Sequence, residues 1–134
     1  MSEINQPQND DDAIWAAVCH GVSLIATAAL AFWLVPIVIM LAKRNSPFIV
    51  QHAKEQLNFQ LSMIFWGVIL FLTTVIAGAT AAAGGSAGLA TLATGAFVLL
   101  CVQGLFVFVM EIVATVKAAG GNAYRFPLTL RLIK

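Results

Sequence analysis

Charged side chains are scarce in this sequence of 134 residues. Asp, Glu, Lys and Arg together make up 10% of the chain, whereas hydrophobic residues make up 60%. The mean hydropathy is +0.92, and a chain of this size cannot bury so much apolar surface in one small water-soluble core. The scarcity of charge therefore argues against an ordinary soluble domain and predicts an integral membrane protein.

Sequence motifs for chemistry are missing as well. The chain has no GxSxG, no glycine loop followed by GK[ST], and no Ser or Cys at a suitable spacing from an activating base. Its two cysteines, Cys19 and Cys101, form no CxxC, so neither a disulfide framework nor a zinc site is expected. Its basic residues are scattered, which argues against nucleic-acid binding. We expect no enzyme, no cofactor and no nucleic-acid partner.

The N-terminal part of the chain combines an acidic segment with a long uncharged one. Residues 1–12 hold four acids and no base, which predicts a disordered tail ahead of a single domain over residues 13–134. Residues 13–42 hold no charge and as one helix would span about 45 Å, more than a hydrocarbon core of about 30 Å. With Pro36 to bend or break it, we expect one crossing at about residues 24–42 after an interfacial helix. A re-entrant hairpin is the alternative, and it would place the N-terminus on the other side.

Two further crossings are predicted downstream. Ser46 and Pro47 mark a helix start, as N-cap and first helical residue. Residues 56–110 then contain neither charge nor His, and small residues at 83–88 divide them into crossings at about residues 58–80 and 89–116. The last helix should stop at Gly120 and Gly121. The predicted fold is all-α, an integral membrane protein with about three transmembrane helices, the first bent or broken.

Basic residues predict the orientation and the place of the C-terminal tail. They flank the uncharged segments near residues 43–54 and after the third crossing, while the connection at 83–88 has none. Both basic regions should be cytoplasmic, in the inner membrane of a bacterium, with the N-terminus outside if the first segment crosses once. Apolar residues alternate along 124–133, so we expect an extended tail at the headgroups, anchored by Arg125, Arg131 and Lys134.

Polar residues concentrate at the start of the second predicted crossing. At 100° per residue they fall in one arc, and Glu111 of the third crossing lies at the same depth. This candidate polar cluster comprises Gln51, His52, Lys54, Glu55, Gln56, Asn58 and Glu111. The cluster either fastens helices together or forms a vestibule or partner-docking surface. His52 and Glu55 are three residues apart, but no second His or carboxylate completes a metal site, so no metal is expected.

Glu111 is the only acid of the last two apolar segments. An unpaired carboxylate at that depth is costly, so we expect it to pair with Lys54, Arg125 or His52, with a proton or ion relay as the alternative. Small residues such as those at Ala77 and Ala81 let helix backbones approach closely.

Several of these segments resemble a known family: Trp15 with Cys19–His20, Ser46–Phe48, His52–Gln60 and Tyr124–Thr129. They resemble small bacterial membrane proteins of a domain-of-unknown-function family related to the Tic-twenty subunit of the chloroplast import translocon. This resemblance implies a multi-pass helical protein without known catalysis, with plastid relatives that act in protein import.

Together these observations predict an accessory, scaffold or assembly factor that acts through helix contacts. Its partners would be the lipid bilayer and either further copies of itself or a larger membrane protein. The alternative is a small channel or a translocon-like component.

Overall fold

The computed structural model describes residues 6–26 and 33–133, which form four α-helices. These are α1 (Asp10–Ala26), α2 (Leu34–Ala42), α3 (Pro47–Ala82) and α4 (Ala87–Ala119). The described residues contain no strand, so the predicted all-α class is confirmed. The chain divides into two compact units, one of residues 1–62 with 108–134 and one of residues 63–107.

The first helix begins earlier than the sequence predicted. The Asn9 side-chain oxygen accepts a hydrogen bond from the Asp12 N–H at 3.0 Å, and Asp12 Oδ2 accepts one from the Gln8 N–H at 3.0 Å. The first bond caps a free N–H group of the first turn, where acidic side chains are also favoured by the helix dipole, and the second ties the preceding residue to that turn. Residues 10–12, which composition assigned to a disordered tail, therefore start α1, and Asp12 is buried.

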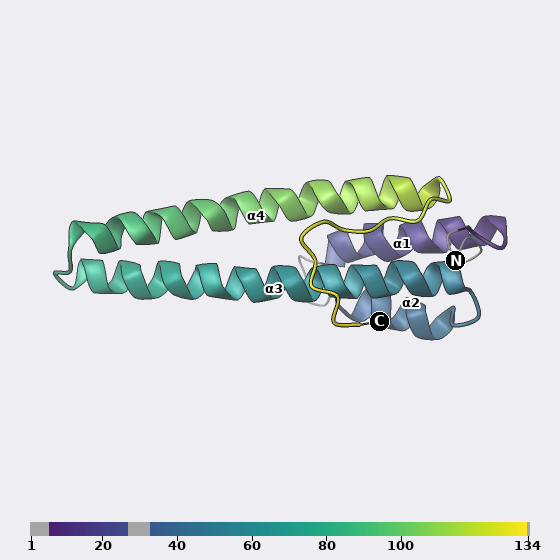
Figure 1. Ribbon diagram of the computed structural model, residues 1–134, viewed down its shortest axis with the longest axis horizontal. Helices are drawn as coiled ribbons and strands as arrows, with labels where there is room; N and C mark the ends of the chain where they lie inside the picture. The colour runs from purple at the N-terminus through teal and green to yellow at the C-terminus, as the bar shows by residue number, and fades with distance from the viewer. Residues whose placement is uncertain (1–5, 27–32, 134) are drawn as a thin grey trace. The chain divides into compact units, whose positions relative to one another are not determined.

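The start of α1 lies beside the start of α3. Ser46 Oγ donates a hydrogen bond of 2.8 Å to Asp12 Oδ2, and α2 leads directly into Ser46 through a short turn. In Figure 1, α1 leads away from this point and α2 leads back toward it. The two helices pack against one another, with Cys19 and Ile39 in a buried cluster that α3 completes with Ile49 and Ala53.

A first crossing at residues 24–42 is not confirmed. Residues 27–32 lie outside the described part of the chain, and the nine residues of α2 would span only about 14 Å, less than half of a hydrocarbon core. The antiparallel α1 and α2 match the hairpin alternative better than one bent crossing. If residues 13–42 formed one bent crossing, the start of α1 would not lie beside the start of α3.

The helices α3 and α4 are long and apolar enough to cross a membrane. They contain 36 and 33 residues, and only 11% of the most apolar 18-residue stretch of each is buried. The core helix of a soluble protein would bury most of that stretch. Among the described helices these two alone meet the length and composition of a membrane span. They contain the predicted crossings at 58–80 and 89–116.

Glycines terminate both long helices where the sequence predicted. After α3 the chain turns at Gly84, whose φ is +94°, and the Gly85 N–H donates to the Thr80 carbonyl at 3.0 Å. After α4 the φ of Gly121 is +70°, and the Asn122 N–H donates to the Lys117 carbonyl at 3.0 Å. Such left-handed residues are the usual way to satisfy the last carbonyls of a helix. The predicted helix start at Pro47 is confirmed too, because Ser46 Oγ lies 3.4 Å from the Ile49 N–H.

The arrangement of α1 and α2 predicts the side of the N-terminus. With Cys19 and Cys101 replaced by Ala, single cysteines in place of Gln6, Asn45 and Ser86 should report sidedness by labelling with an impermeant maleimide in intact and permeabilised cells. Because α1 starts beside α3, positions 6 and 45 should label from the same side and position 86 from the opposite side. Labelling of position 6 together with position 86 would show that residues 13–42 cross once.

Candidate functional site

The first four turns of α3 form the centre of the larger unit. Apolar residues such as Ile49 and Ala53 are fully buried there, and so are the polar residues His52, Gln56 and Asn58, each at most 2% exposed. Most of the predicted polar cluster is therefore interior, and only Gln51 and Lys54 are half-buried. By its contacts it separates into two sets, which we call the interior chain (His20, His52, Gln56, Glu111) and the tail clamp (Glu55, Asn58, Ser62).

The interior chain joins three helices through four side chains. Gln56 Nε2 of α3 donates a hydrogen bond to Glu111 Oε1 of α4, and Gln56 Oε1 lies 2.5 Å from His20 Nδ1 of α1. His20 Nε2 lies 2.9 Å from His52 Nδ1. The partner that the structure gives Glu111 is thus an amide, rather than the expected Lys54, Arg125 or His52.

These contacts determine which atoms of the interior chain carry a proton. Because the Gln56 amide donates through Nε2, its Oε1 accepts, so His20 Nδ1 is the donor. Burial lowers the pKa of His20 to about 4, against the opposing effect of its hydrogen bond to Gln56. Neutral His20 then accepts at Nε2 from the His52 Nδ1–H. Each of the three contacts that link these four side chains therefore joins one donor to one acceptor.

His20 and Cys19 together do not have the features of a catalytic pair. Burial raises the pKa of the Cys19 thiol to about 12, and the nearby Glu111 charge acts in the same direction. A thiol held protonated is not a nucleophile. His52 belongs to the interior chain and Glu55 to the tail clamp, so the two do not converge on one ligand. Among the described residues no group of three or more His, Cys, Asp or Glu side chains is placed to hold a metal ion.

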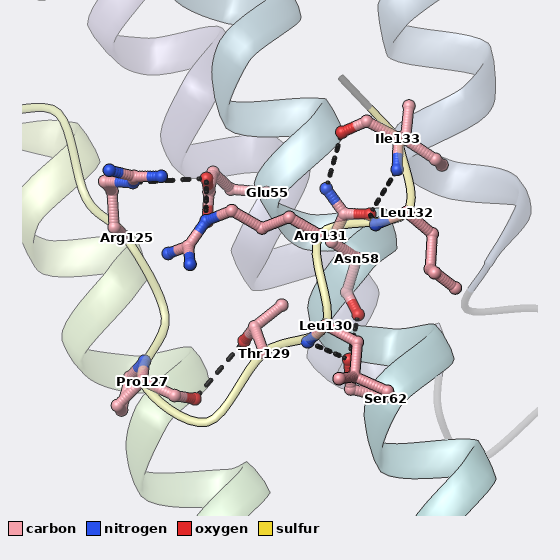
Figure 2. A network of polar contacts seen from close by, with 10 residues as sticks. All are labelled: Glu55, Asn58, Ser62, Arg125, Pro127, Thr129, Leu130, Arg131, Leu132 and Ile133. Carbon is pink, nitrogen blue, oxygen red and sulfur yellow. Dashed lines mark hydrogen bonds and ion pairs between the residues drawn. The ribbon is translucent and has the colours of Figure 1, made fainter.

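The tail clamp holds the C-terminal segment against α3 (Figure 2). Asn58 Oδ1 accepts hydrogen bonds from the N–H groups of Leu132 and Ile133 at 2.9 and 2.8 Å, and Asn58 Nδ2 donates to the Ile133 carbonyl at 2.9 Å. One turn further on, Ser62 Oγ accepts from the Leu130 N–H at 2.8 Å. The sequence predicted that Asn58 faces another helix, whereas it pairs with an extended backbone as a neighbouring strand would.

The clamp also holds basic residues of the tail. Arg125 Nε and Arg131 Nε lie 3.5 and 3.3 Å from the same oxygen, Glu55 Oε1, and the two arginine side chains remain 63% and 42% exposed. Nearby, Phe126 is buried and stacks on Phe59 with ring centres 4.0 Å apart. Contact of these arginines with headgroups stays a prediction, and Lys134 lies outside the described residues.

The remaining predicted residues, Gln51 and Lys54, line a hollow between α3 and the tail together with Glu55. Two residues outside the predicted cluster take part in the site. His20 looked isolated in the sequence because its partner Gln56 is 36 residues away. Ser62 shares the helical face of Asn58 and Glu55, and that spacing was the available signal.

Loss of the Gln56 amide should destabilise the protein more than loss of a similar amide elsewhere on α3. Gln56→Leu leaves His20 and Glu111 without their buried partner, so the free energy of unfolding should fall by about 1–3 kcal/mol. Gln51→Leu, at a half-buried position on the same helix, is the matched control. Unfolding in mixed detergent micelles with increasing dodecyl sulfate measures both. Equal effects of the two substitutions would contradict the interior chain.

Loss of Asn58 should release the end of the tail. In Asn58→Leu, hydrogen exchange at the Leu132 and Ile133 amides should rise about tenfold or more, because both lose their acceptor. Ser62→Ala is the control, since it should raise exchange at Leu130 alone. Exchange measured by mass spectrometry after peptic digestion separates these positions. Unchanged exchange at residues 132 and 133 in Asn58→Leu would mean that the clamp does not hold the tail.

A family model matches this chain over residues 11–133, and its description is the magnetosome magnetite crystal formation protein family. A search of curated proteins and a search of solved structures returned no match. The family match corrects the Tic-twenty-like resemblance, which rested on short segments of α1, of the start of α3 and of the C-terminal tail. Since the match spans nearly the whole chain, the protein belongs to the MamF/MmsF family of magnetosome magnetite crystal formation proteins.

Proposed function

We propose that this protein is a multi-pass membrane accessory or assembly factor for magnetite crystal formation, and that it acts through helix contacts rather than catalysis. The observation that carries the proposal is the contrast between its two kinds of surface. His52, Gln56, Asn58 and Ser62 of α3 are engaged inside the protein by α1, α4 and the tail, whereas many large apolar side chains further along α3 and on α4 are exposed.

The outward apolar surface is extensive on both long helices. Large side chains such as Phe71, Phe97 and Leu105 are 56%, 54% and 65% exposed. In a membrane such side chains contact lipid or the helices of another protein. On α4, Gly104 is exposed and has open space where a side chain would stand. A small residue on an exposed face allows a partner helix to approach closely, so the face of α4 that carries Gly104 is where we place the contact.

In this proposal α3 and α4 cross the membrane as a hairpin with residues 83–86 on the far side. The basic residues before α3 and after α4 face the cytoplasm, in keeping with the distribution of charge. The N-terminus lies on the cytoplasmic side, because α1 begins beside Ser46. The translocon-like alternative loses its basis, because the family match replaces the plastid resemblance.

A non-enzymatic role is supported by how the ionisable groups are used. Glu111 is 3% exposed and bound to Gln56, and the Cys19 thiol is held protonated. A general base or nucleophile would need access to substrate and a suitable proton affinity. These groups instead join helices to one another.

The test compares three strains of a magnetite-forming host: one lacking the gene, one with Gly104→Leu and one with Leu105→Ile. A Cβ atom at position 104 meets no other atom within 4 Å, so Gly104→Leu should keep the fold and lose contact with a partner. Leu105→Ile changes a neighbouring exposed side chain while keeping its volume.

Deletion should change crystal size or number in electron micrographs. Gly104→Leu should reproduce that change while the amount of membrane-bound protein in immunoblots stays at the wild-type level, and Leu105→Ile should not. Normal crystals in the deletion strain would contradict the role in crystal formation. An altered deletion strain with a normal Gly104→Leu strain would contradict only the α4 contact. An ion flux in liposomes that is lost in Glu111→Gln would support a channel instead.

A further inference from the structure

A hollow of about 490 Å³ lies between the start of α3 and the C-terminal tail. Three basic side chains (Lys54, Arg125 and Arg131) and one acid (Glu55) line it, and the two arginines share that single carboxylate. A concentration of positive charge is unusual in this chain, whose net charge is +1 over 134 residues. The hollow therefore has the charge expected of a site for an anion.

The two arginines are positioned so that part of each guanidinium is left for a ligand. Both use Nε to contact the single oxygen Glu55 Oε1. Figure 2 shows the two guanidinium groups reaching Glu55 from different parts of the tail, with the terminal nitrogens of Arg131 pointing away from the carboxylate. A guanidinium carries five N–H donors, and a phosphate group accepts such donors in pairs. One carboxylate cannot neutralise two arginines, so an anionic oxygen beside them would balance the remaining charge.

The hollow also offers hydrogen-bond acceptors. Gln51 and Glu55 line it, and Gln51 Oε1 and Glu55 Oε2 are buried atoms without a hydrogen-bond partner among the described residues. Buried acceptors without a donor are uncommon in proteins. A ligand that fits both features has anionic oxygens for the arginines and hydroxyl donors for Gln51 and Glu55.

The position of the hollow along α3 indicates where such a ligand comes from. Leu61 is the first large apolar side chain of α3 that is substantially exposed, and it lies seven residues after Lys54, about 10 Å along the helix axis. Exposed apolar side chains continue beyond it. A phosphate at the hollow would thus lie at headgroup depth when the exposed part of α3 is in the acyl region.

We propose that this hollow binds a phosphodiester that carries free hydroxyls, such as the glycerophosphate headgroup of phosphatidylglycerol. Arg125 and Arg131 hold the phosphate, and Gln51 and Glu55 accept from the glycerol hydroxyls. Glu55 also keeps the two guanidinium groups together when the site is empty. This site is independent of the proposed role in crystal formation, which could fail without affecting it.

The test is lipid binding to the purified full-length protein in detergent, measured by native mass spectrometry. Three lipids with identical acyl chains are compared: phosphatidylglycerol, phosphatidylmethanol, which has the same charge but no headgroup hydroxyl, and zwitterionic phosphatidylcholine. Phosphatidylglycerol should bind about tenfold more tightly than phosphatidylcholine, with phosphatidylmethanol between them. Equal binding of phosphatidylglycerol and phosphatidylcholine would overturn the proposal.

Two variants assign the binding to the hollow. Arg125→Gln with Arg131→Gln should remove the preference for anionic lipids, whereas Arg44→Gln with Lys117→Gln, an equal loss of charge at exposed positions outside the hollow, should keep it. Hydrogen exchange at Leu132 and Ile133 shows whether the tail is still docked. If it is not, Gln51→Leu decides: it should abolish the preference for phosphatidylglycerol over phosphatidylmethanol. An unchanged preference in Gln51→Leu, or equal losses in both double variants, would overturn the proposal.

Free glycerol 3-phosphate distinguishes the source of the ligand. If the site takes a membrane lipid, millimolar glycerol 3-phosphate should leave phosphatidylglycerol bound, because it has no acyl chains to lie along α3. Displacement of the lipid by glycerol 3-phosphate, but not by inorganic phosphate, would identify a soluble polyol phosphate as the ligand. Displacement by inorganic phosphate at the same concentration would show that the hydroxyls are not recognised and would overturn the proposal.

Discussion

The amide of Gln56 is the group on which the larger unit depends. It lies in an interior without measurable exposure and faces a histidine of α1 on one side and a carboxylate of α4 on the other. A buried polar group is costly unless it is hydrogen-bonded, and His20 and Glu111 are buried as well. One amide offers both a donor and an acceptor, so it bonds at once to His20 Nδ1 and to one of the two carboxylate oxygens of Glu111. The positions of α1 and of the end of α4 on α3 follow from that requirement.

The same helix carries a second set of contacts at Asn58 and Ser62, two and six residues after Gln56, and these hold the chain after α4. An extended segment without a neighbouring strand has unpaired N–H and C=O groups, and Asn58 and Ser62 supply partners for several of them. Docking of the tail in turn brings Arg125 and Arg131 to Glu55. The basic hollow therefore exists because the tail is held by α3, which links the stability of the fold to a candidate lipid site.

Local signals predicted the boundaries of the long helices well. Ser46 with Pro47, Gly84 with Gly85 and the glycines after Ala119 act within one turn of the chain, so their effect can be worked out from neighbouring residues alone. The periodicity of α3 also placed His52, Glu55 and Asn58 on one face. It could not show what covers that face, because the partners of Gln56 and Asn58 lie 36 to 75 residues away along the chain.

The N-terminal segment and the family assignment could not be predicted from local sequence patterns either. Uncharged sequence over residues 13–42 satisfies a single crossing and a hairpin equally well, and only the long-range contact between Asp12 and Ser46 favours the second. Apolar helices are likewise shared by unrelated membrane proteins because the bilayer imposes the same requirement on all of them. A short polar block at a helix start did not suffice to identify the family.

The central claim is that Gln56 couples α1 to α4, and a double-mutant cycle between His20 and Glu111 tests it most directly. The free energy of unfolding of His20→Ala, Glu111→Gln and the double variant is measured in mixed micelles, first with Gln56 present and then in Gln56→Leu. His20 and Glu111 should show a coupling of about 1 kcal/mol with Gln56 present and none without it. No coupling in either background, or the same coupling in both, would contradict the account.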